Sequence, residues 1–433
     1  MHRIALTIFP EQGKSWLLMS CLEGEKKIYE KFFKQMQEAT VQKLKFYLNM
    51  MLPLFSENMV LSPDLWKSWT EDIQGAYTYY ANLNGSDGKR MEEVDEVAYQ
   101  YMDPYPGRGK VRGAFWNLDQ VFGKFYFKQT LKFLDKIKPD IIILYEPNSI
   151  LYVLKMLNLS KKEGFKLVIE TTEWRNPKDY RGIIPRVINT EKDLQKKYID
   201  KKVGNVIAIS KYLYQHYLEQ NCNTILLPPI FPEADKKKKL IRENSDNRKV
   251  LKIVYAGALA SKDYIDTLLH AIIRLNTDEV RVVIDIIGPD KMQVQKLVGN
   301  DELEKYGIYC HGRLSHDKTL SIVEKADLSV LLRMNKRYAK AGVSTKFCEA
   351  MMLGVPSICT SVGGTDLFVK DKYNGFLVRN NDLNTLETTL LSIIDLSREQ
   401  IEEIKNNALT TANELFTPDK YIEQFNAFLN KCK

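Results

Sequence analysis

The segment 341–378, AGVSTKFCEAMMLGVPSICTSVGGTDLFVKDKYNGFLV, constrains the fold of this chain more than any other. It contains, in order, a glycine loop, a short helix, a buried strand and a second glycine turn. Gly342 permits a close backbone approach, and Ser344 or Thr345 can cap a helix whose first N–H groups suit an anion. Such an order is typical of an α/β fold that binds an anionic ligand at its strand ends.

Two charges are expected on one side of this helix. Lys346 and Glu349 are three residues apart, so their side chains share one face of the helix. The ammonium could bind a phosphate, and the carboxylate could bind a pair of sugar hydroxyls. Gly363 and Gly364 follow the buried strand and permit another close backbone approach before a second helix start. An exposed ion pair alone contributes only about 0.2–0.5 kcal/mol. The flanking glycines favour a ligand site that accepts a diphosphate.

These residues resemble the donor-binding half of glycosyltransferase family 4, in the bacterial polysaccharide branch of the group 1 glycosyltransferases. The residues that match the family's motifs are Gly342, Thr345, Lys346, Glu349, Ala350, Gly354, Pro356, Gly363, Gly364, Asn374 and Gly375. The resemblance implies the GT-B fold, an α/β fold of two facing Rossmann-like domains with parallel sheets and a C-terminal helix that crosses back to the first domain. It also implies that Glu349 holds the donor ribose and that Lys346 or Thr345 lies at the diphosphate.

The C-terminal half alternates strands and helices from residue 250 onwards. Apolar runs predict strands at 250–260, 280–287, 307–310, 326–333 and 355–359. This alternation indicates a parallel sheet covered on both faces, with ligands at the carboxyl ends of its strands. Gly257, Lys262 and Arg333 lie at such ends, so we add them to the predicted donor site.

The N-terminal half follows the same order less clearly. Apolar runs predict strands at 2–9, 140–145, 166–170, 206–210 and 226–229. Gly13 lies in the loop after the first of these strands and Glu173 just after the third, so both are candidates for the acceptor cleft. The triplet that begins at Gly13 is not a nucleotide-triphosphate loop, because that motif needs a glycine where Ile8 stands.

A charged interval predicts the domain boundary. It contains Lys236 to Lys239 and a polar run that is too charged for either core. Thr417 and Pro418 then predict the start of a terminal helix. The predicted parts are an N-terminal acceptor-side Rossmann-like domain at 1–232, a linker at 233–249, a C-terminal nucleotide-sugar-binding Rossmann-like domain at 250–416, and the crossing helix at 417–433.

Two departures from the family pattern bear on catalysis. Ala341 stands where many members have the first of two glutamates, and only His2 and His216 precede residue 230. We therefore expect the donor sugar on backbone N–H groups of 341–344 or on other side chains, and we assign no catalytic base. Two alternatives stay open, namely a catalytically silent GT-B-like binding or chaperone subunit and a nucleotide-sugar epimerase or hydrolase.

Composition limits the cofactors and partners. The formal net charge of +8 fits peripheral association with an anionic membrane, although most lysines are expected to be solvated surface. No apolar run approaches the ~20 residues that span a bilayer, so we expect a cytoplasmic protein at the inner face of the cell membrane. The chain has no Asp-x-Asp pair and its six cysteines lack zinc spacing. This predicts reduced thiols and transfer without a metal or another cofactor. No recognition-helix motif supports nucleic-acid binding.

The sequence thus predicts a hexosyltransferase that moves a sugar from a nucleotide-diphosphate sugar to a hydroxyl of a glycan or lipid-linked acceptor. The resemblance implies retention at the anomeric carbon and a role in cell-surface polysaccharide synthesis, of lipopolysaccharide or capsule. Cations and helix N-termini would stabilise the leaving diphosphate.

Overall fold

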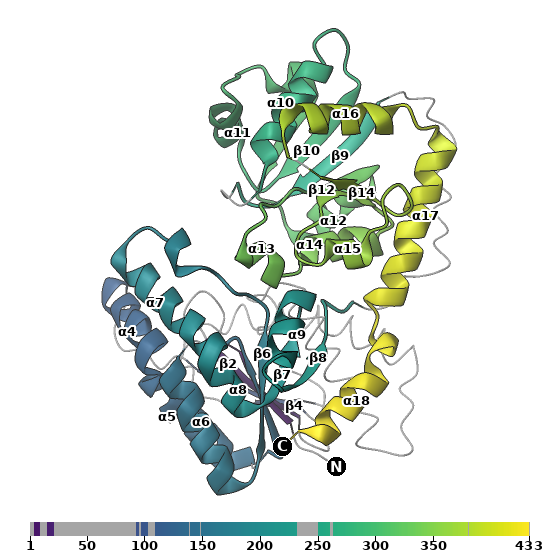
Figure 1. Ribbon diagram of the computed structural model, residues 1–433. Helices are drawn as coiled ribbons and strands as arrows, with labels where there is room; N and C mark the ends of the chain where they lie inside the picture. Colours follow the sequence, from purple (N-terminus) through teal and green to yellow (C-terminus); the bar gives the residue numbers. More distant parts are fainter. Residues whose placement is uncertain are drawn as a thin grey trace. The chain divides into compact units, whose positions relative to one another are not determined.

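The structure is a computed structural model that describes residues 4–8, 15–20, 92–94, 97–102, 109–137, 139–147, 149–231, 250–259, 263–379 and 381–432. The chain divides into two compact units (Figure 1). The N-terminal unit comprises Met1–Ile230 together with Tyr421–Lys433, and the C-terminal unit comprises Phe231–Lys420. The predicted linker at 233–249 lies outside the described residues.

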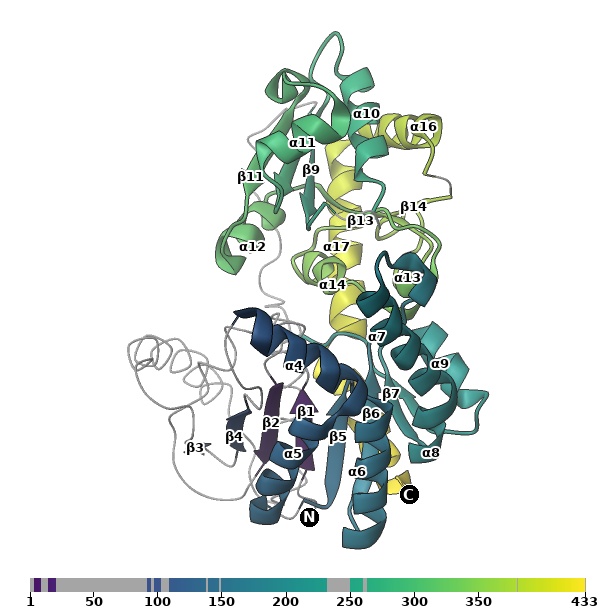
Figure 2. The same ribbon diagram turned by 90° about the vertical axis from the view of Figure 1, so that its left-hand side faces the viewer.

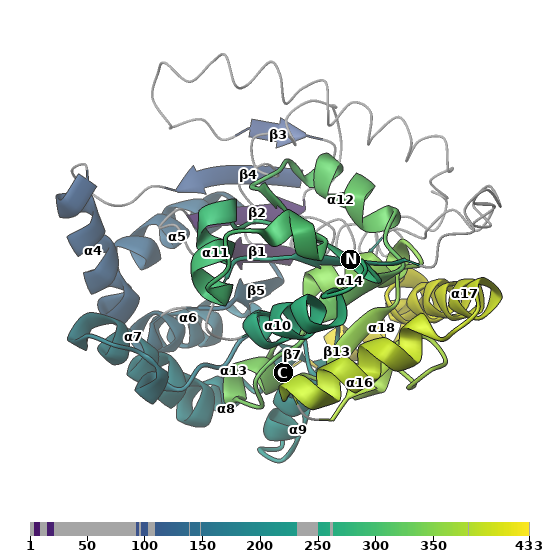
Figure 3. The same cartoon turned by 90° about the horizontal axis from the view of Figure 1, so that it is seen from above.

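The N-terminal unit is built on an eight-stranded sheet in the order β3-β4-β2-β1-β5-β6-β7-β8 (Figure 3). The strands are β1 (Ile4–Ile8), β2 (Ser15–Ser20), β3 (Glu92–Val94), β4 (Val97–Met102), β5 (Ile141–Tyr145), β6 (Lys166–Thr171), β7 (Asn205–Ala208) and β8 (Asn223–Leu226). The predicted parallel sheet is confirmed for β1 and β5 to β8. The first four residues of β5 are buried because a strand covered on both faces needs apolar side chains in both directions.

Three strands of this sheet were not predicted. β2, β3 and β4 extend it through antiparallel pairings, β1 with β2, β2 with β4, and β4 with β3. Their sequences, SWLLMS, EEV and VAYQYM, carry polar residues and lack the continuous apolar run of a buried parallel strand. The parallel part of the sheet was therefore recognisable from sequence, and its antiparallel extension was not.

Helices cover the N-terminal sheet, with α4, α5 and α6 in front of it in Figure 2. The helices of this unit are α4 (Gly109–Phe122), α5 (Lys124–Ile137), α6 (Ile150–Glu163), α7 (Ile183–Leu194), α8 (Asp200–Val203), α9 (Lys211–Leu218) and α18 (Ile422–Lys431). A π-helical stretch, Gln195–Ile199, connects α7 to α8, so these three segments run on without a break. Such stretches are rare and occur often at functional positions.

The C-terminal helix α18 belongs to the N-terminal unit, as the GT-B prediction requires. It packs on β8, where the Asn223 side-chain nitrogen donates to the Phe428 carbonyl at 3.1 Å. The last strand of this unit was predicted at 226–229, whereas β8 spans Asn223–Leu226. The prediction began too late because Asn223 is polar, and its side chain is satisfied by this contact with α18. The predicted helix start is confirmed in part, since a 3-10 helix begins at Pro418 (Pro418–Lys420) and α18 begins at Ile422, while the Thr417 hydroxyl donates to the Asn413 carbonyl at 2.6 Å.

The C-terminal unit contains a six-stranded sheet in the order β11-β10-β9-β12-β13-β14, and all its pairings are parallel. The strands are β9 (Leu251–Ala256), β10 (Val282–Ile287), β11 (Ile308–Gly312), β12 (Leu328–Leu331), β13 (Ser357–Thr360) and β14 (Phe376–Val378). The order reverses at β9, which has β10 on one side and β12 on the other. In open parallel sheets a ligand crevice forms at such a switch point, at the carboxyl ends of the strands.

The helices of the C-terminal unit pack against this sheet through an apolar core. They are α10 (Ile265–Leu275), α11 (Lys291–Val298), α12 (His316–Glu324), α13 (Arg337–Ala341), α14 (Thr345–Met352), α15 (Thr365–Phe368), α16 (Leu383–Ile394) and α17 (Arg398–Leu415). α10 and α16 lie side by side (Figure 1), and both contribute buried residues to the core. Within the described ranges, every helix is too short or too polar to cross a bilayer.

Candidate functional site

Four predicted donor residues lie at the carboxyl edge of the C-terminal sheet. Gly257 follows β9, Arg333 lies just after β12, and Gly363 and Gly364 lie after β13. The first of these loops contacts the loop after β10, where Gly288 has a φ of +121°. A Cβ atom on Gly288 would lie 2.2 Å from the Gly257 carbonyl oxygen, so only glycine fits there.

The loops after β9 and β12 are joined at the switch point. The Tyr264 N–H donates to the Leu332 carbonyl at 2.8 Å, and Asp263 and Arg333 form an isolated β-bridge. The Arg333 Nε lies 3.8 Å from the Asp263 Oδ1, beyond hydrogen-bond distance. Both atoms are buried, and neither has a hydrogen-bond partner among the described residues.

Tyr255 positions the Asp263 carboxylate. Its hydroxyl lies 3.0 Å from the Asp263 Oδ2 and 2.9 Å from the Ala258 carbonyl oxygen. Burial raises the pKa of Tyr255, and the neighbouring Asp263 charge raises it further, so the phenol stays a hydrogen-bond donor. The Asp263 Oδ1 and the Arg333 Nε thus form only a long ion pair, and neither has a hydrogen bond among the described residues. A buried polar group without a partner costs about 1–3 kcal/mol, which a ligand with hydroxyl and anionic groups would recover.

Gly342 and Gly363 meet in front of α14. A Cβ atom on Gly363 would lie 2.2 Å from the Ala339 carbonyl oxygen and 2.7 Å from that of Gly342, and its φ is +74°. Gly342 itself has an extended backbone, with φ −104° and ψ 153°, which any residue can adopt. Of the two predicted close approaches, the one at Gly363 requires glycine, whereas the backbone conformation of Gly342 does not.

The start of α14 carries the three other predicted donor residues. Ser344 is the N-cap, and its side chain accepts from the Phe347 N–H at 3.4 Å, so Thr345 is the first helical residue. Lys346 is exposed and Glu349, one turn later, is partly buried. Their spacing on α14 agrees with the shared face expected from the sequence.

Arg333 and Glu349 both act on the thiol of Cys348, which locates them near each other. Burial raises the pKa of Cys348 well above its usual range, the Glu349 carboxylate raises it further, and Arg333 opposes the rise. The structure thereby brings a residue that follows β12 close to the start of α14, in agreement with the contact between these two elements.

Two threonines fix the turn after β13. The Thr365 hydroxyl donates to the Thr360 carbonyl at 2.6 Å, and the Thr360 hydroxyl accepts from the Arg333 N–H at 2.9 Å. Gly364, with φ +81°, precedes α15, which begins at Thr365 as expected. That helix has only four residues, so its dipole is that of about one turn.

Other residues singled out in the sequence lie outside the described residues or elsewhere in the chain. Lys262 and Gly13 lie outside the described residues, as do His2 and Cys21. Ala341, at the position of the missing glutamate, is fully buried at the end of α13. His216 belongs to the N-terminal unit, where its ring packs on Trp174 at a centroid distance of 4.5 Å. The other five cysteines are free thiols.

Sequence analysis missed a charged cluster at the carboxyl edge of the N-terminal sheet, which we call the Glu146 cluster. Glu146 follows β5 with φ +42°, which is uncommon for a residue other than glycine. Its carboxylate lies 3.1 and 3.3 Å from the Lys196 ammonium and accepts from the Glu173 N–H at 2.9 Å and from the Thr172 N–H. Lys196 also donates to the Thr171 hydroxyl at 2.6 Å.

Burial and charge oppose each other in this cluster. Burial disfavours ionisation of Glu146, but Lys196 and the backbone N–H groups outweigh it, so the pKa of Glu146 is lowered. Burial lowers the pKa of Lys192, although Glu146 opposes that change. Burial raises the pKa of Asp200 to about 6. One sequence signal was available, since Glu146 directly follows a strand of buried apolar residues, but its partner lies 50 residues later on the π-helical stretch.

Glu173, the predicted acceptor-cleft residue, lies at the margin of the Glu146 cluster. Its side chain is exposed and forms an ion pair with Arg175 at 2.7 Å. The adjacent Trp174 is buried and donates from Nε1 to Asp193 at 2.9 Å. Glu173 is thus an exposed acid after β6, whereas its neighbour Trp174 packs inside the N-terminal unit. The acceptor role of Glu173 stays a prediction.

Comparison with known proteins relates the C-terminal unit to a sequence family. Residues 236–411 match the family profile described as "Glycosyl transferases group 1". A curated relative, the uncharacterized glycosyltransferase MJ1069 of Methanocaldococcus jannaschii, is 27% identical over 209 residues, which are 46% of this chain and 51% of the relative. The match therefore spans about half the length of that relative.

Solved glycosyltransferase structures share the fold at low sequence identity. Sucrose-phosphate synthase from Thermosynechococcus elongatus has a TM-score of 0.52 at 16% identity, over 71% of this chain and 77% of that one. HepE from Anabaena in complex with UDP has a TM-score of 0.52 at 16% identity, over 70% and 81%. A TarM variant from S. aureus has a TM-score of 0.51 at 16% identity, over 70% and 58%. The predicted GT-B fold is confirmed, and the C-terminal unit carries the match to the group 1 glycosyltransferases.

Proposed function

We propose that this chain is a family 4 type glycosyltransferase that moves a hexose from a nucleotide-diphosphate sugar to a hydroxyl of a glycan or lipid-linked acceptor. The observation that carries the proposal is the long ion pair of Asp263 and Arg333 at the switch point of the C-terminal sheet, whose two facing atoms are buried and have no hydrogen bond among the described residues. A nucleotide sugar supplies both partners, because its hydroxyls donate to a carboxylate and its diphosphate accepts from a guanidinium.

The donor is proposed to be a UDP-sugar. Structures of HepE in complex with UDP-glucose and with UDP support this choice, as does the UDP in the TarM structure. Glu349 would hold the ribose, while Lys346, Thr345 and the first N–H groups of α14 would face the diphosphate. The glycines after β9 and β13 would let the backbone approach it, and Arg333 with Lys262 would add positive charge.

Electrostatic stabilisation of the leaving group is the proposed source of catalysis. Negative charge grows on the diphosphate as the glycosidic bond breaks, and preorganised cations and N–H groups favour that state over the intact donor. Because two lysines and Arg333 can supply this charge, transfer is proposed to need no metal or other cofactor. Retention at the anomeric carbon is part of the proposal, and no residue is assigned as a base.

The proposed setting is cell-surface polysaccharide synthesis, of lipopolysaccharide or capsule, in the cytoplasm at the inner face of the membrane. A structure of WaaB, a lipopolysaccharide outer core galactosyltransferase, supports the setting with a TM-score of 0.50 at 15% identity, over 74% of this chain and 82% of that one. The net charge of +8, with the basic tract Lys236 to Lys239, fits association with an anionic membrane.

Product analysis tests the proposal. The protein is incubated with a panel of UDP-sugars with and without acceptor glycans, and UDP, free sugar and glycan products are separated. The proposal expects UDP release that depends on the acceptor and a product with the anomeric configuration of the donor. Release of free or epimerised sugar without an acceptor would indicate a hydrolase or epimerase. Donor binding with no turnover on any acceptor would indicate a catalytically silent subunit.

A further inference from the structure

Large apolar side chains are exposed together on three neighbouring helices of the N-terminal unit. We call this surface the α4/α6/α7 face, since α4 contacts both of the other helices. Its exposed apolar residues include Leu118, Phe122, Leu151, Ile183, Val187 and Leu194. Ile183 is 83% exposed and Val187 is 50% exposed, although both lie on a regular helix. Grouped apolar exposure of this kind marks an interaction surface.

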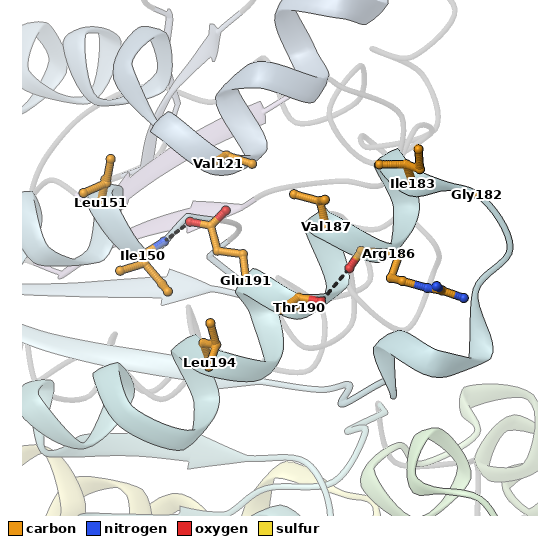
Figure 4. A pocket seen from close by; sticks show the side chains of 10 residues that line it. All are labelled: Val121, Ile150, Leu151, Gly182, Ile183, Arg186, Val187, Thr190, Glu191 and Leu194. Carbon is orange, nitrogen blue, oxygen red and sulfur yellow. Dashed lines mark hydrogen bonds between the residues drawn. The ribbon is translucent and has the colours of Figure 1, made fainter.

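A groove of about 700 Å³ runs along this face (Figure 4). Ile183, Val187 and Leu194 lie on one side of α7, at positions separated by four and seven residues. They line the groove opposite Val121 of α4 and Ile150 of α6. A helix of a globular unit normally turns such a stripe toward the core, whereas here it faces an open groove.

The polar groups in the groove are mostly satisfied within the protein. The Thr190 hydroxyl donates to the Arg186 carbonyl at 2.8 Å, and the Ile150 N–H donates to Glu191 at 3.0 Å. A protein partner usually forms about one hydrogen bond per 100–200 Å² of interface. The groove offers few groups for such bonds, so a hydrocarbon occupant matches it better.

Glu191 is only partly ionised at neutral pH and mostly neutral below it, which limits the negative charge of the groove. Burial raises the pKa of Glu191 to about 7, against the hydrogen bond from Ile150. Its second carboxyl oxygen is buried and has no partner among the described residues. A neutral acid in this position is compatible with lipid chains beside it.

Cations surround the exposed start of α7. Lys178, Arg181 and Arg186 are exposed, and Asp179 is the exposed acid among them. Figure 4 shows the Arg186 side chain pointing away from Val121, and its guanidinium donates to the Tyr180 carbonyl at 3.4 Å. This excess of positive charge beside an apolar face complements the phosphates and chains of an anionic bilayer.

We propose that the α4/α6/α7 face docks on an anionic lipid bilayer, with Ile183 and Val187 among the lipid chains and Arg181 and Arg186 at the phosphates. The proposal deepens the membrane association in the proposed function by naming the surface that provides it. Membrane docking does not require sugar transfer, so the docking proposal and the proposed function can fail separately.

Vesicle co-sedimentation without sugar nucleotide tests this proposal. The probes are phosphatidylcholine vesicles with and without a third of phosphatidylglycerol. Wild type is expected to bind the mixed vesicles, and Ile183→Ser with Val187→Ser to lower the partition coefficient about tenfold or more. Arg181→Gln with Arg186→Gln should remove the preference for phosphatidylglycerol. Leu218→Ser is the matched control, because Leu218 is 50% exposed on α9 of the same unit, and it should bind like wild type.

Thermal unfolding of each variant verifies that it folds before binding is compared. Unchanged binding of the Ile183 and Val187 variant, an equal loss in Leu218→Ser, or no binding of wild type to the mixed vesicles would each overturn the proposal. So would a wild-type dimer in light scattering that the Ile183 and Val187 variant dissociates, since the face would then join two copies of the chain. A transfer assay on a water-soluble acceptor, run in parallel, reports on the proposed function alone.

Discussion

The carboxyl edges of the two sheets differ in what joins their loops. In the C-terminal unit the loops meet through backbone, with Gly288 against Gly257 and Gly363 against the end of α13. In the N-terminal unit the loops after β5 and β6 meet through side chains, chiefly Glu146 and Lys196. At the C-terminal edge Arg333 and Asp263 form a long ion pair at 3.8 Å without a hydrogen bond, whereas Lys196 donates to Glu146 at 3.1 Å. The carboxyl edge of the C-terminal sheet is thus suited to bind a ligand, and that of the N-terminal sheet to stabilise its own loops.

The largest expected effect comes from removing one charge of the N-terminal ion pair. Lys196→Met leaves the Glu146 carboxylate buried without its counter-ion, and we expect the free energy of unfolding to fall by about 3–5 kcal/mol. Urea denaturation measures this change in the free energy of unfolding. Lys162→Met is the control, because Lys162 is 79% exposed and its ion pair with Glu163 lies in solvent, where the expected cost is below about 1 kcal/mol. Equal costs would contradict a structural role for the Glu146 cluster.

The backbone contact in the C-terminal unit predicts a difference between two adjacent glycines. Both Gly363 and Gly364 have positive φ, but only at Gly363 would a Cβ atom meet a backbone oxygen, at 2.2 Å. We expect Gly363→Ala to lower the free energy of unfolding by about 2–3 kcal/mol and Gly364→Ala by about 1 kcal/mol. Chemical denaturation of both variants measures this difference. If the two values coincide, close packing of these loops does not shape the site.

Substitution of Arg333 tests whether its side chain, whose Nε has no hydrogen bond among the described residues, serves a ligand. Hydrogen bonds to a charged group contribute about 1.5–3 kcal/mol, so Arg333→Met should weaken UDP binding by about tenfold or more. Isothermal titration calorimetry gives the dissociation constant. Lys336→Met, an exposed cation in the same loop, is expected to bind UDP like wild type. Equal loss in both variants would reduce the role of Arg333 to general positive charge.

A smaller effect is expected from pH in the N-terminal unit. The pKa of Glu191 is raised to about 7 in the folded state, against about 4.3 in an unfolded chain. The folded state therefore holds a proton that the unfolded state has released, and stability contributed by this group is lost as pH rises from about 4 to 7. Glu191→Gln avoids that loss, so its Tm relative to wild type should increase between pH 5 and pH 8.

Differential scanning fluorimetry at the two pH values measures this change. Glu163→Gln is a suitable control, because Glu163 is an exposed carboxylate at the end of α6 whose ion pair with Lys162 lies in solvent. A relative Tm of Glu191→Gln that stays constant with pH would show that this carboxyl titrates normally in the folded protein.

The two edges also differ in how far sequence could predict them. Signals for the C-terminal edge are local, as with Ser344, which caps α14, and Gly354, whose φ of +69° ends it. Both Gly342 and Gly363 were predicted to permit a close backbone approach, but their contact with each other was not predictable, because it joins residues far apart in the sequence. Asp263 was absent from the predicted site because its role depends on Arg333, which follows a different strand.

The N-terminal edge depends on contacts that no local pattern encodes. Lys196 lies 50 residues from Glu146, on a π-helical stretch whose sequence, QKKYI, resembles any polar helix. β2 and β4 pair across many residues of intervening chain, so neither is recognisable by itself. The sequence could therefore predict the GT-B fold and the glycine-rich edge, but not the cluster that fixes the other sheet.

Nucleotide binding at Glu349 tests the central claim most directly. Wild type, Glu349→Gln and Glu403→Gln are titrated with UDP, GDP and ADP by calorimetry, Glu403 being an exposed carboxylate on α17 of the same unit. If the C-terminal edge is the donor site, UDP binds selectively, Glu349→Gln weakens it about tenfold, and Glu403→Gln does not. Equal UDP affinity in all three proteins, or no binding of any nucleotide, would contradict the account.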